Sequence, residues 1–268
     1  MRNTWKSNLR VALPQSLPLE SLQEWPPPTN HRPPFSMDTA RIAALLEPFL
    51  DQSLQESQLH QISIYIDLLQ RWNARINLTA IRDEEEIVTR HFGESLFMAR
   101  HLFPEVTSGS VSIPRLEGGP SKLRLGGNVR VLDIGSGAGF PGLPLKIWAP
   151  NIHLTMIESN HKKAVFLREV TRALTLTNIN VITERAEILS QRVGKDFPAF
   201  DIVTLRAVEH FETILPRAAT FLAPQASLAV LIGTAQVPEL TSLTPLKWAP
   251  PINVPRSLQR VMSIGVSL

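Results

Sequence analysis

Hydrophobic residues recur at intervals of three and four along residues 59–76, a spacing that predicts an amphipathic helix. The positions are Leu59, Ile62, Ile66, Leu69 and Ile76. A second helical pattern, MDTARIAALLEPFL, begins at Met37, and a third follows Asp83, which can cap a helix and precedes three glutamates. The third pattern runs towards Leu102. The sequence therefore predicts a small helical element in residues 37–106.

From Val129 the pattern changes to short β-rich runs separated by helical stretches. Five runs predict strands: VRVLDI, HLTMIE, INVIT, FDIVTL and SLAVLI. The tail KWAPPINVPRSLQRVMSIGVSL predicts two more strands, the last being QRVMSIGV. Alternating strands and helices predict an α/β domain in residues 129–268, with a mostly parallel seven-stranded sheet and helices on both faces. Ligands bind such sheets at the carboxyl ends of the strands.

Two segments show neither pattern. Residues 107–128 are rich in Gly, Ser and Pro, which predicts a flexible surface connection. Residues 1–36 hold seven of the 22 prolines and predict a disordered extension. Because a helical pattern starts at Met37, translation from Met37 instead of Met1 is a hypothesis that the intact mass of the native protein tests.

The composition removes several classes of chemistry. The chain has no cysteine, which excludes disulfides, thiolate metal sites and a cysteine nucleophile. No apolar run reaches the roughly 18 residues of a membrane span, and the N-terminus lacks the apolar core of a signal peptide. These features suit a cytoplasmic protein. A net charge of +3 permits an anionic partner such as RNA without requiring one.

The stretch VLDIGSGAGFPGLPL carries the clearest chemical signal. Its glycines, Gly135, Gly137 and Gly139, directly follow the first predicted strand and permit positive φ angles and close approach of a ligand to the backbone. A tight strand-to-helix turn is the alternative, but three alternating glycines exceed what a turn requires. We therefore predict that this loop binds a ligand.

Two ligand classes compete for this loop. A dinucleotide site has the spacing G-x-G-x-x-G, whereas this loop has G-x-G-x-G with Phe140 where the third glycine would stand. Asp133 precedes the glycines, and a carboxylate suits the cationic S-adenosylmethionine better than a pyrophosphate. Glu158 ends the second strand and could accept hydrogen bonds from a ribose diol of either ligand. The spacing favours S-adenosylmethionine.

Other charged residues leave alternatives open. Glu187 follows the third strand, near where an adenine would lie, and is equally well explained as a solvated acid at a helix start. His91 stands in H-F-G-E, which does not match the zinc-binding H-E-x-x-H, so we predict no metal site. A basic RNA-facing surface and an ordinary mixed surface are about equally compatible with seven residues: Arg71, Arg75, Arg82, Arg90, Lys162, Lys163 and Arg168.

From about Met37 to the C-terminus, the chain resembles the bacterial small-subunit ribosomal RNA methyltransferase G family, also called glucose-inhibited division protein B. Four segments carry the resemblance: WNARINLTAIRDEEEIVTRHFGESL, DIGSGAGFPGLPL, ESNHKKAVFLRE and FDIVTLRAVEHF. The first includes matching positions Trp72, Asn73, Asn77, Leu78, Thr79, Arg90, His91 and Ser95. The resemblance is more specific than any glycine pattern alone, and it implies a Rossmann-like class I S-adenosylmethionine-dependent methyltransferase.

The resemblance implies methylation of N7 of the guanosine at position 527 of 16S rRNA, in the 530 loop. It further implies that the cofactor contacts Gly135, Phe140, the Ala186–Glu187 pair and Arg206, where Arg206 is also a candidate for orienting the substrate. The chain departs from the family at two positions. Glu94 stands where Asp is usual, and Ile232 stands where a lysine is usual.

Guanine N7 has a lone pair and no proton to lose, so its methylation requires positioning and no catalytic acid or base. The sequence accordingly offers no convincing acid–base pair. We expect a monomer that acts on the 16S rRNA of the small ribosomal subunit. Two alternatives remain: a methyltransferase acting on another RNA, a protein or a small molecule, and a non-catalytic RNA- or cofactor-binding protein.

Overall fold

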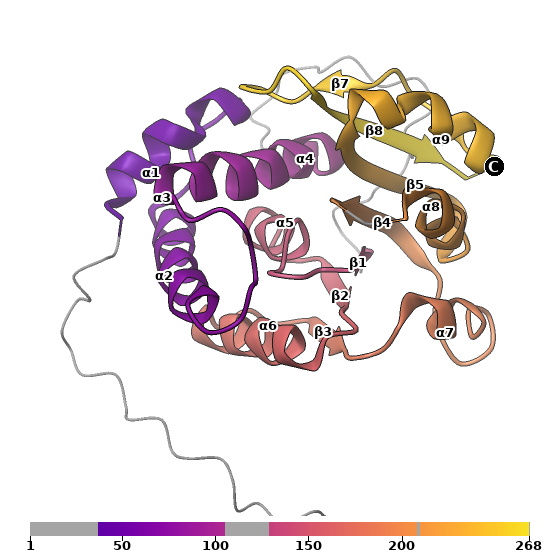
Figure 1. Ribbon diagram of the computed structural model, residues 1–268, viewed down its shortest axis with the longest axis horizontal. Helices are drawn as coiled ribbons and strands as arrows, with labels where there is room; N and C mark the ends of the chain where they lie inside the picture. Colours follow the sequence, from indigo (N-terminus) through magenta and orange to yellow (C-terminus); the bar gives the residue numbers. More distant parts are fainter. Residues whose placement is uncertain (1–36, 105–128, 208–209, 268) are drawn as a thin grey trace, which may run out of the picture. The chain divides into compact units, whose positions relative to one another are not determined.

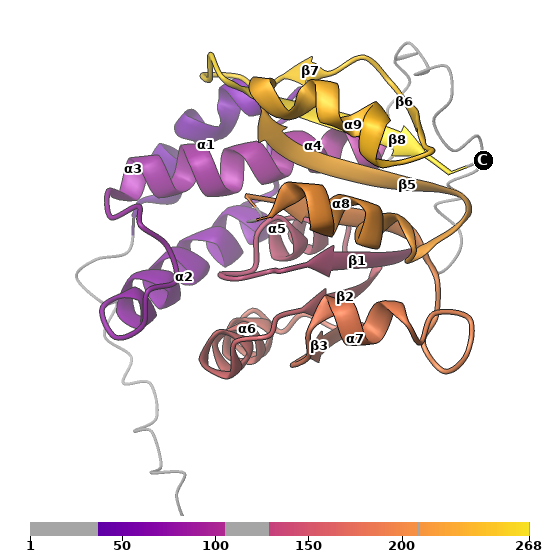
Figure 2. The same ribbon diagram turned by 45° about the vertical axis from the view of Figure 1, so that its right-hand side comes forward.

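The computed structural model describes residues 37–104, 129–207 and 210–267 (Figures 1 and 2). The predicted extension of residues 1–36 and the predicted connection of residues 107–128 lie outside the described residues. The division into a helical element and a methyltransferase domain stays a prediction.

The N-terminal helices follow the predicted pattern closely. They comprise α1 (Thr39–Leu46), a 3₁₀ turn η1 (Glu47–Phe49), α2 (Glu56–Asn73), α3 (Glu84–Glu86), the π-helical η2 (Ile87–Gly93) and α4 (Glu94–Leu102). The last three segments form one continuous helix, and Asp83 caps its start by accepting a hydrogen bond from the Glu86 N–H (2.8 Å). The prediction that this helix begins after Asp83 and runs to Leu102 is confirmed.

Helix α2 ends earlier than its hydrophobic period suggested. The Asn73 side chain accepts hydrogen bonds from the backbone N–H groups of Leu78 (2.9 Å) and Thr79 (3.1 Å), which turns the chain out of the helix. Ile76 therefore lies beyond the helix, although it still packs against the hydrophobic core.

The remainder of the described chain builds one sheet with its connecting helices. The strands are β1 (Arg130–Ile134), β2 (His153–Ile157), β3 (Ile179–Ile182), β4 (Phe200–Arg206), β5 (Leu222–Gly233), β6 (Lys247–Trp248), β7 (Ile252–Asn253) and β8 (Arg260–Val266). The helices are α5 (Gly142–Trp148), α6 (His161–Ala173), α7 (Ala186–Ser190), α8 (Phe211–Ala219), the 3₁₀ turn η4 (Thr234–Gln236) and α9 (Val237–Leu243).

The sheet has the order β3-β2-β1-β4-β5-β8-β6, with β7 also paired to β8. Strands β1 to β5 are parallel, and β8 runs antiparallel to β5. The mostly parallel sheet is thus confirmed, but over the described residues it has eight strands instead of seven. The first of the two predicted tail strands is divided by Ala249–Pro251 into β6 and β7, because prolines cannot donate to a strand ladder.

Alternating side chains of the central strands serve two hydrophobic cores. Val131 of β1 and Ile202 of β4 pack on the face that carries the N-terminal helices with α5 and α6. Leu132 and Val203 pack on the other face, towards α7, α8 and α9 (Figure 1). Helices therefore cover both faces, as predicted. The N-terminal helices share one core with the sheet, so they pack against the same face of the sheet as α5 and α6.

Candidate cofactor-binding site

The glycine loop leaves the carboxyl end of β1 with three residues at positive φ. Gly135, Gly137 and Gly139 have φ angles of 68°, 55° and 90°, as the sequence predicted. The backbone N–H groups of Gly135 and Ser136 both donate to the Ile157 carbonyl oxygen, at 2.9 and 3.1 Å. This contact with the end of β2 fixes the start of the loop beside the next strand.

Glu158 joins the glycine loop to the segment after β2. Glu158 as a whole is 6% exposed, and its carboxylate accepts hydrogen bonds from Gly137 N (2.8 Å) and Asn160 N (2.7 Å), one on each oxygen. Each carboxylate oxygen can accept more than one hydrogen bond. The structure thus brings Glu158 and Gly137 together, and the carboxylate retains capacity for a ligand hydroxyl.

Gly137 offers the open backbone that a ligand needs. A β-carbon built there would lie 3.8 Å from the nearest non-adjacent atom, the Gly135 carbonyl oxygen. Gly142 differs, since its β-carbon would lie 2.8 Å from Asp133 Oδ2. Gly137 thus leaves room for a ligand outside the loop, whereas Gly142 permits tight packing against Asp133 inside it.

Asp133 supports the loop from within. Its carboxylate is fully buried and accepts hydrogen bonds from Gly142 N (3.2 Å) and Thr204 Oγ1 (2.9 Å). Burial raises the pKa of Asp133 to about 6, partly offset by its hydrogen bonds. The sequence suggested that this carboxylate faces a cationic ligand; in the structure it ties β1 to β4 and to the start of α5.

Phe140 lies in an aromatic cluster and not on an open surface. Its ring stacks on Tyr65 of α2, with centroids 5.3 Å apart, and on His91, at 4.7 Å. The Tyr65 hydroxyl donates a hydrogen bond to the Ala138 carbonyl oxygen within the glycine loop. Sequence reasoning missed Tyr65, because a lone tyrosine on the buried face of a helix does not identify its partner.

Gly139 is the point where helix α2 meets the loop. A β-carbon there would overlap the Tyr65 hydroxyl and lie 2.6 Å from Leu143 Cδ1. Only glycine combines this lack of space with a φ of 90°. Helix α2 therefore fixes the glycine loop directly.

The residues expected near an adenine lie at the start of α7, after β3. Ala186 is buried, at 6% exposure. Glu187 is about half exposed and forms an ion pair with Arg217 of α8. Because β2 and β3 are parallel and in register, this helix start lies at the same edge of the sheet as Glu158. The two alternatives for Glu187 remain open.

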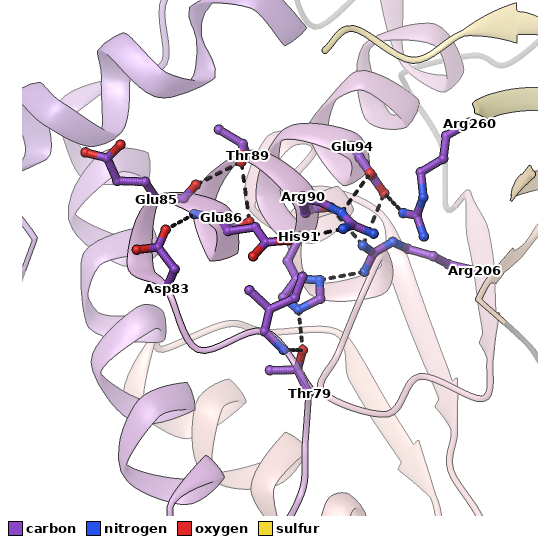
Figure 3. Close-up of polar contacts among 11 residues, drawn as sticks. Thr79, Asp83, Glu85, Glu86, Thr89, Arg90, His91, Glu94, Arg206 and Arg260 are labelled. Carbon is purple, nitrogen blue, oxygen red and sulfur yellow. Dashed lines mark hydrogen bonds and ion pairs between the residues drawn. The ribbon is translucent and has the colours of Figure 1, made fainter. Parts of the chain in front are cut away.

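Arg206, which the resemblance implies as a cofactor contact, is buried at the end of β4. Its side chain is 7% exposed and contacts the helix formed by η2 and α4 (Figure 3). It donates to the Arg90 carbonyl oxygen (2.7 Å), to His91 Nδ1 (3.0 Å) and to Glu94 Oε2 (3.2 Å). Its guanidinium also lies 5.8 Å from the Phe140 ring. Arg206 thus connects the end of β4 to the N-terminal helices.

His91 is neutral within this network. Burial, followed by the nearby Arg206, lowers its pKa to about 3. Since arginine can only donate, His91 Nδ1 is the acceptor, which assigns the ring hydrogen to Nε2, 2.7 Å from Thr79 Oγ1. Both ring nitrogens of His91 are therefore engaged within the protein.

The two departures from the family lie on opposite faces of the sheet. Glu94 is 3% exposed and contacts both Arg206 and Arg260, whose Nη1 lies 2.5 Å from Glu94 Oε2. Ile232 is buried in the core on the other face, beside α8 and α9. Sequence reasoning did not single out Arg260.

Some of the basic residues have local roles. Arg71 donates to the Asp67 carbonyl oxygen (3.2 Å), and Arg82 to the Thr79 carbonyl oxygen (2.6 Å). Arg168 donates to the Val181 carbonyl oxygen (2.9 Å).

No three histidine, aspartate or glutamate side chains in the described ranges could together hold a metal ion. Nor does any described helix have the length and apolar character needed to cross a membrane.

The sheet order and the loop after β1 define a Rossmann-like fold of the class I methyltransferase type. A solved structure of a mutant of MtNAS has a similar fold, with a TM-score of 0.50 and 11% identity over 79% of this chain and 74% of that one. The chain belongs to the rRNA small subunit methyltransferase G family, whose defining pattern matches residues 58–109 and 121–246.

Two relatives, both named ribosomal RNA small subunit methyltransferase G, show the extent of the similarity. The protein of Roseiflexus castenholzii is 42% identical over 165 residues, which cover 60% of this chain and 59% of the relative. The protein of Xanthomonas axonopodis pv. citri is 36% identical over 208 residues, which cover 77% and 84%. The chain thus spans less than two thirds of the Roseiflexus relative and most of the Xanthomonas one.

Proposed function

We propose that this protein uses S-adenosylmethionine to methylate N7 of the guanosine at position 527 of 16S rRNA, in the 530 loop. Membership of the family supports the reaction class. The observation that carries the proposal is the glycine loop held by Glu158, with open space at Gly137, at the carboxyl end of β1. The residues proposed to form the cofactor site are Asp133, Gly135, Gly137, Gly139, Phe140, Glu158, Ala186, Glu187 and Arg206.

The residues present fit S-adenosylmethionine in two distinct ways. Gly135, Gly137 and Glu158 offer backbone and carboxylate groups that a ligand can contact directly. Asp133 and Phe140 are buried among protein atoms, so we propose that they act by holding the loop in shape. When bound, the cofactor supplies a methyl group already activated by its sulfonium.

The chain's own contribution would be orientation and exclusion of water. Guanine N7 carries a lone pair and no proton, so no side chain has to remove one. His91 is unsuited to that task in any case, because both of its ring nitrogens are engaged and its pKa is about 3. Orientation alone supplies on the order of 7–11 kcal/mol in favourable cases.

The proposed partner is the 16S rRNA within the small ribosomal subunit, and we propose a cytoplasmic monomer that needs no metal. The alternative substrates are another RNA, a protein or a small molecule. Since Ile232 is buried where the family usually has lysine, any RNA contact of that lysine must here be made by other residues.

The test uses S-adenosylmethionine carrying a radioactive methyl group and small subunits that lack the modification. We expect label in 7-methylguanosine, mapped by digestion to the 530 loop. Glu158→Ala should lose both cofactor binding and label, because it removes a proposed ligand contact and the anchor of Gly137. Cofactor binding by the wild-type protein without label in RNA would refute the proposed substrate.

A further inference from the structure

Three arginines from separate elements meet beside the proposed cofactor site (Figure 3). Arg206 ends β4, Arg260 begins β8, and Arg90 lies in η2. Alternation along the strands explains the meeting, since Arg206 shares its face with Ile202, and Arg260 shares its face with Met262, in the core that contains the N-terminal helices. We call Arg90, Arg206 and Arg260 the arginine cluster.

The arginine cluster carries more positive charge than its counter-ions balance. Glu94 Oε2 contacts both Arg206 (3.2 Å) and Arg260 (2.5 Å). Arg90 pairs with Glu86 (3.1 Å) and lies 3.8 Å from Glu94 Oε1. Among the residues that the structure describes, three guanidinium groups thus face two carboxylates. The neutral His91 adds nothing to this count, so a surplus of one positive charge remains.

Several donors of the arginine cluster are still available. The Arg260 side chain is 29% exposed, and within the described ranges its guanidinium makes one hydrogen bond, to Glu94. Arg90 is 43% exposed. The Nε atoms of Arg90 and Arg206 also lack a hydrogen-bond partner, but they are buried, so the donors open to a ligand are the outer nitrogens of Arg260 and Arg90. A guanidinium has five N–H groups, and its planar arrangement matches the oxygens of a phosphate.

We propose that the arginine cluster binds a backbone phosphate of the RNA substrate, with Arg260 and Arg90 in contact with the phosphate. A phosphodiester carries one negative charge, which equals the surplus. Buried beneath them, the Arg206–Glu94 pair positions both arginines, and its contact with Phe140 sets the bound phosphate beside the glycine loop. This inference rests on the proposed function, because it assumes that the substrate is RNA.

The test compares Arg260→Gln with Arg260→Lys and with a control, Arg130→Gln. Arg130 is 44% exposed and pairs with Asp201, but it lies at the amino end of β1, opposite the glycine loop. Arg260→Gln leaves the buried Arg206–Glu94 pair intact. Steady-state methylation of unmodified small subunits gives KM for RNA and kcat, calorimetry gives the affinity for S-adenosylmethionine, and thermal unfolding reports the fold.

For Arg260→Gln we expect KM for RNA to rise roughly ten-fold, while cofactor affinity and thermal midpoint match those of Arg130→Gln. The slope of log KM against log salt should fall by about 0.7–0.9 for the loss of one phosphate contact. Arg260→Lys should recover much of the loss, because it keeps the charge.

Three results would overturn the inference. Arg260→Gln and Arg130→Gln could have the same KM for RNA, or Arg260→Gln could lose as much cofactor affinity as RNA affinity, which would mean that Arg260 only supports the fold. In either case, label in 7-methylguanosine from the wild-type protein would leave the proposed function intact. A wild-type protein that binds cofactor but methylates no RNA would refute both.

Discussion

Replacing Tyr65 by phenylalanine tests whether helix α2 holds the glycine loop in shape for the cofactor. Tyr65 is fully buried, its hydroxyl donates to the Ala138 carbonyl oxygen, and its ring stacks on Phe140. Burial raises the pKa of Tyr65 well above its ordinary value, so the hydroxyl keeps its hydrogen at any pH used for assay. The substitution removes that donor and leaves the ring in place.

The size of the effect follows from the Ala138 carbonyl oxygen, which loses its hydrogen-bond donor. Ala138 is 7% exposed, so water cannot readily replace the lost donor. A buried acceptor without a partner costs about 1–3 kcal/mol. If the loop relaxes in the free protein and must be restored for binding, that free energy weakens cofactor affinity. We therefore expect roughly ten-fold weaker binding of S-adenosylmethionine, which corresponds to about 1.4 kcal/mol.

Isothermal titration calorimetry with S-adenosylmethionine measures the affinity, and urea denaturation measures the free energy of unfolding. Ser63→Ala is the matched control, because Ser63 lies on the same helix and its hydroxyl donates to a carbonyl oxygen, that of Met37, at 3.1 Å. This control also loses one hydrogen bond between a side chain and a carbonyl group, but away from the loop. We expect it to lose stability while keeping wild-type affinity.

Cofactor binding by Tyr65→Phe as tight as that by Ser63→Ala would refute this role of Tyr65. The lost hydrogen bond would then affect only the free energy of unfolding, and Tyr65 would be a core residue with no influence on the loop. Equal losses of affinity in both variants would likewise remove any special role for Tyr65.

Three other substitutions test the site. Gly139→Ala should abolish measurable cofactor binding in calorimetry, because a β-carbon at φ 90° would overlap the Tyr65 hydroxyl; retained binding would contradict this geometry. Glu94→Gln should lower the free energy of unfolding in urea by about 3–5 kcal/mol, since buried Arg206 loses its counter-ion; a loss below 1 kcal/mol would argue against it. Burial lowers the pKa of His91 from 6.5 to about 3, so as pH falls below 6.5 the unfolded chain binds this proton first and stability is lost. The stability advantage of the wild-type protein over His91→Gln should therefore shrink by about 3 kcal/mol between pH 7 and pH 4, and a constant difference would contradict the assignment.

Local patterns were sufficient to predict most of the fold. The spacing of apolar residues placed α2, the cap at Asp83 placed the start of the third helix, and β-rich runs placed β1 to β5 and β8. Each signal depends on residues close in sequence, so it can be recognised without knowledge of tertiary contacts. The short α9 was not predicted, and the tail gave three strands where two were expected, because two-residue strands have no period to detect.

Contacts between distant segments were harder to predict. Glycine spacing located the loop. The hydrogen bond that fixes it, from the Tyr65 hydroxyl to the Ala138 carbonyl oxygen, joins residues 73 positions apart. A carboxylate at a strand end suggested that Asp133 faces a ligand, yet Thr204 and Gly142 satisfy it inside the domain. The resemblance named Arg206 as a cofactor contact, but the sequence did not reveal that its side chain is buried against the N-terminal helices. Which face of a strand meets which helix is decided by packing, and a single sequence does not reveal it.

The π-helical segment determines which side chains of α4 face the arginine cluster. A π-helix holds an extra residue in its turn, so Ile87–Gly93 sets the rotational phase at which α4 begins. If the same seven residues formed regular α-helix, every later side chain of this helix would be turned by about 100° around the helix axis. Glu94 would then point away from Arg206, and a buried charge would lose its partner. The wider π-helical turn thus keeps the Glu94 carboxylate directed at Arg206 and Arg260.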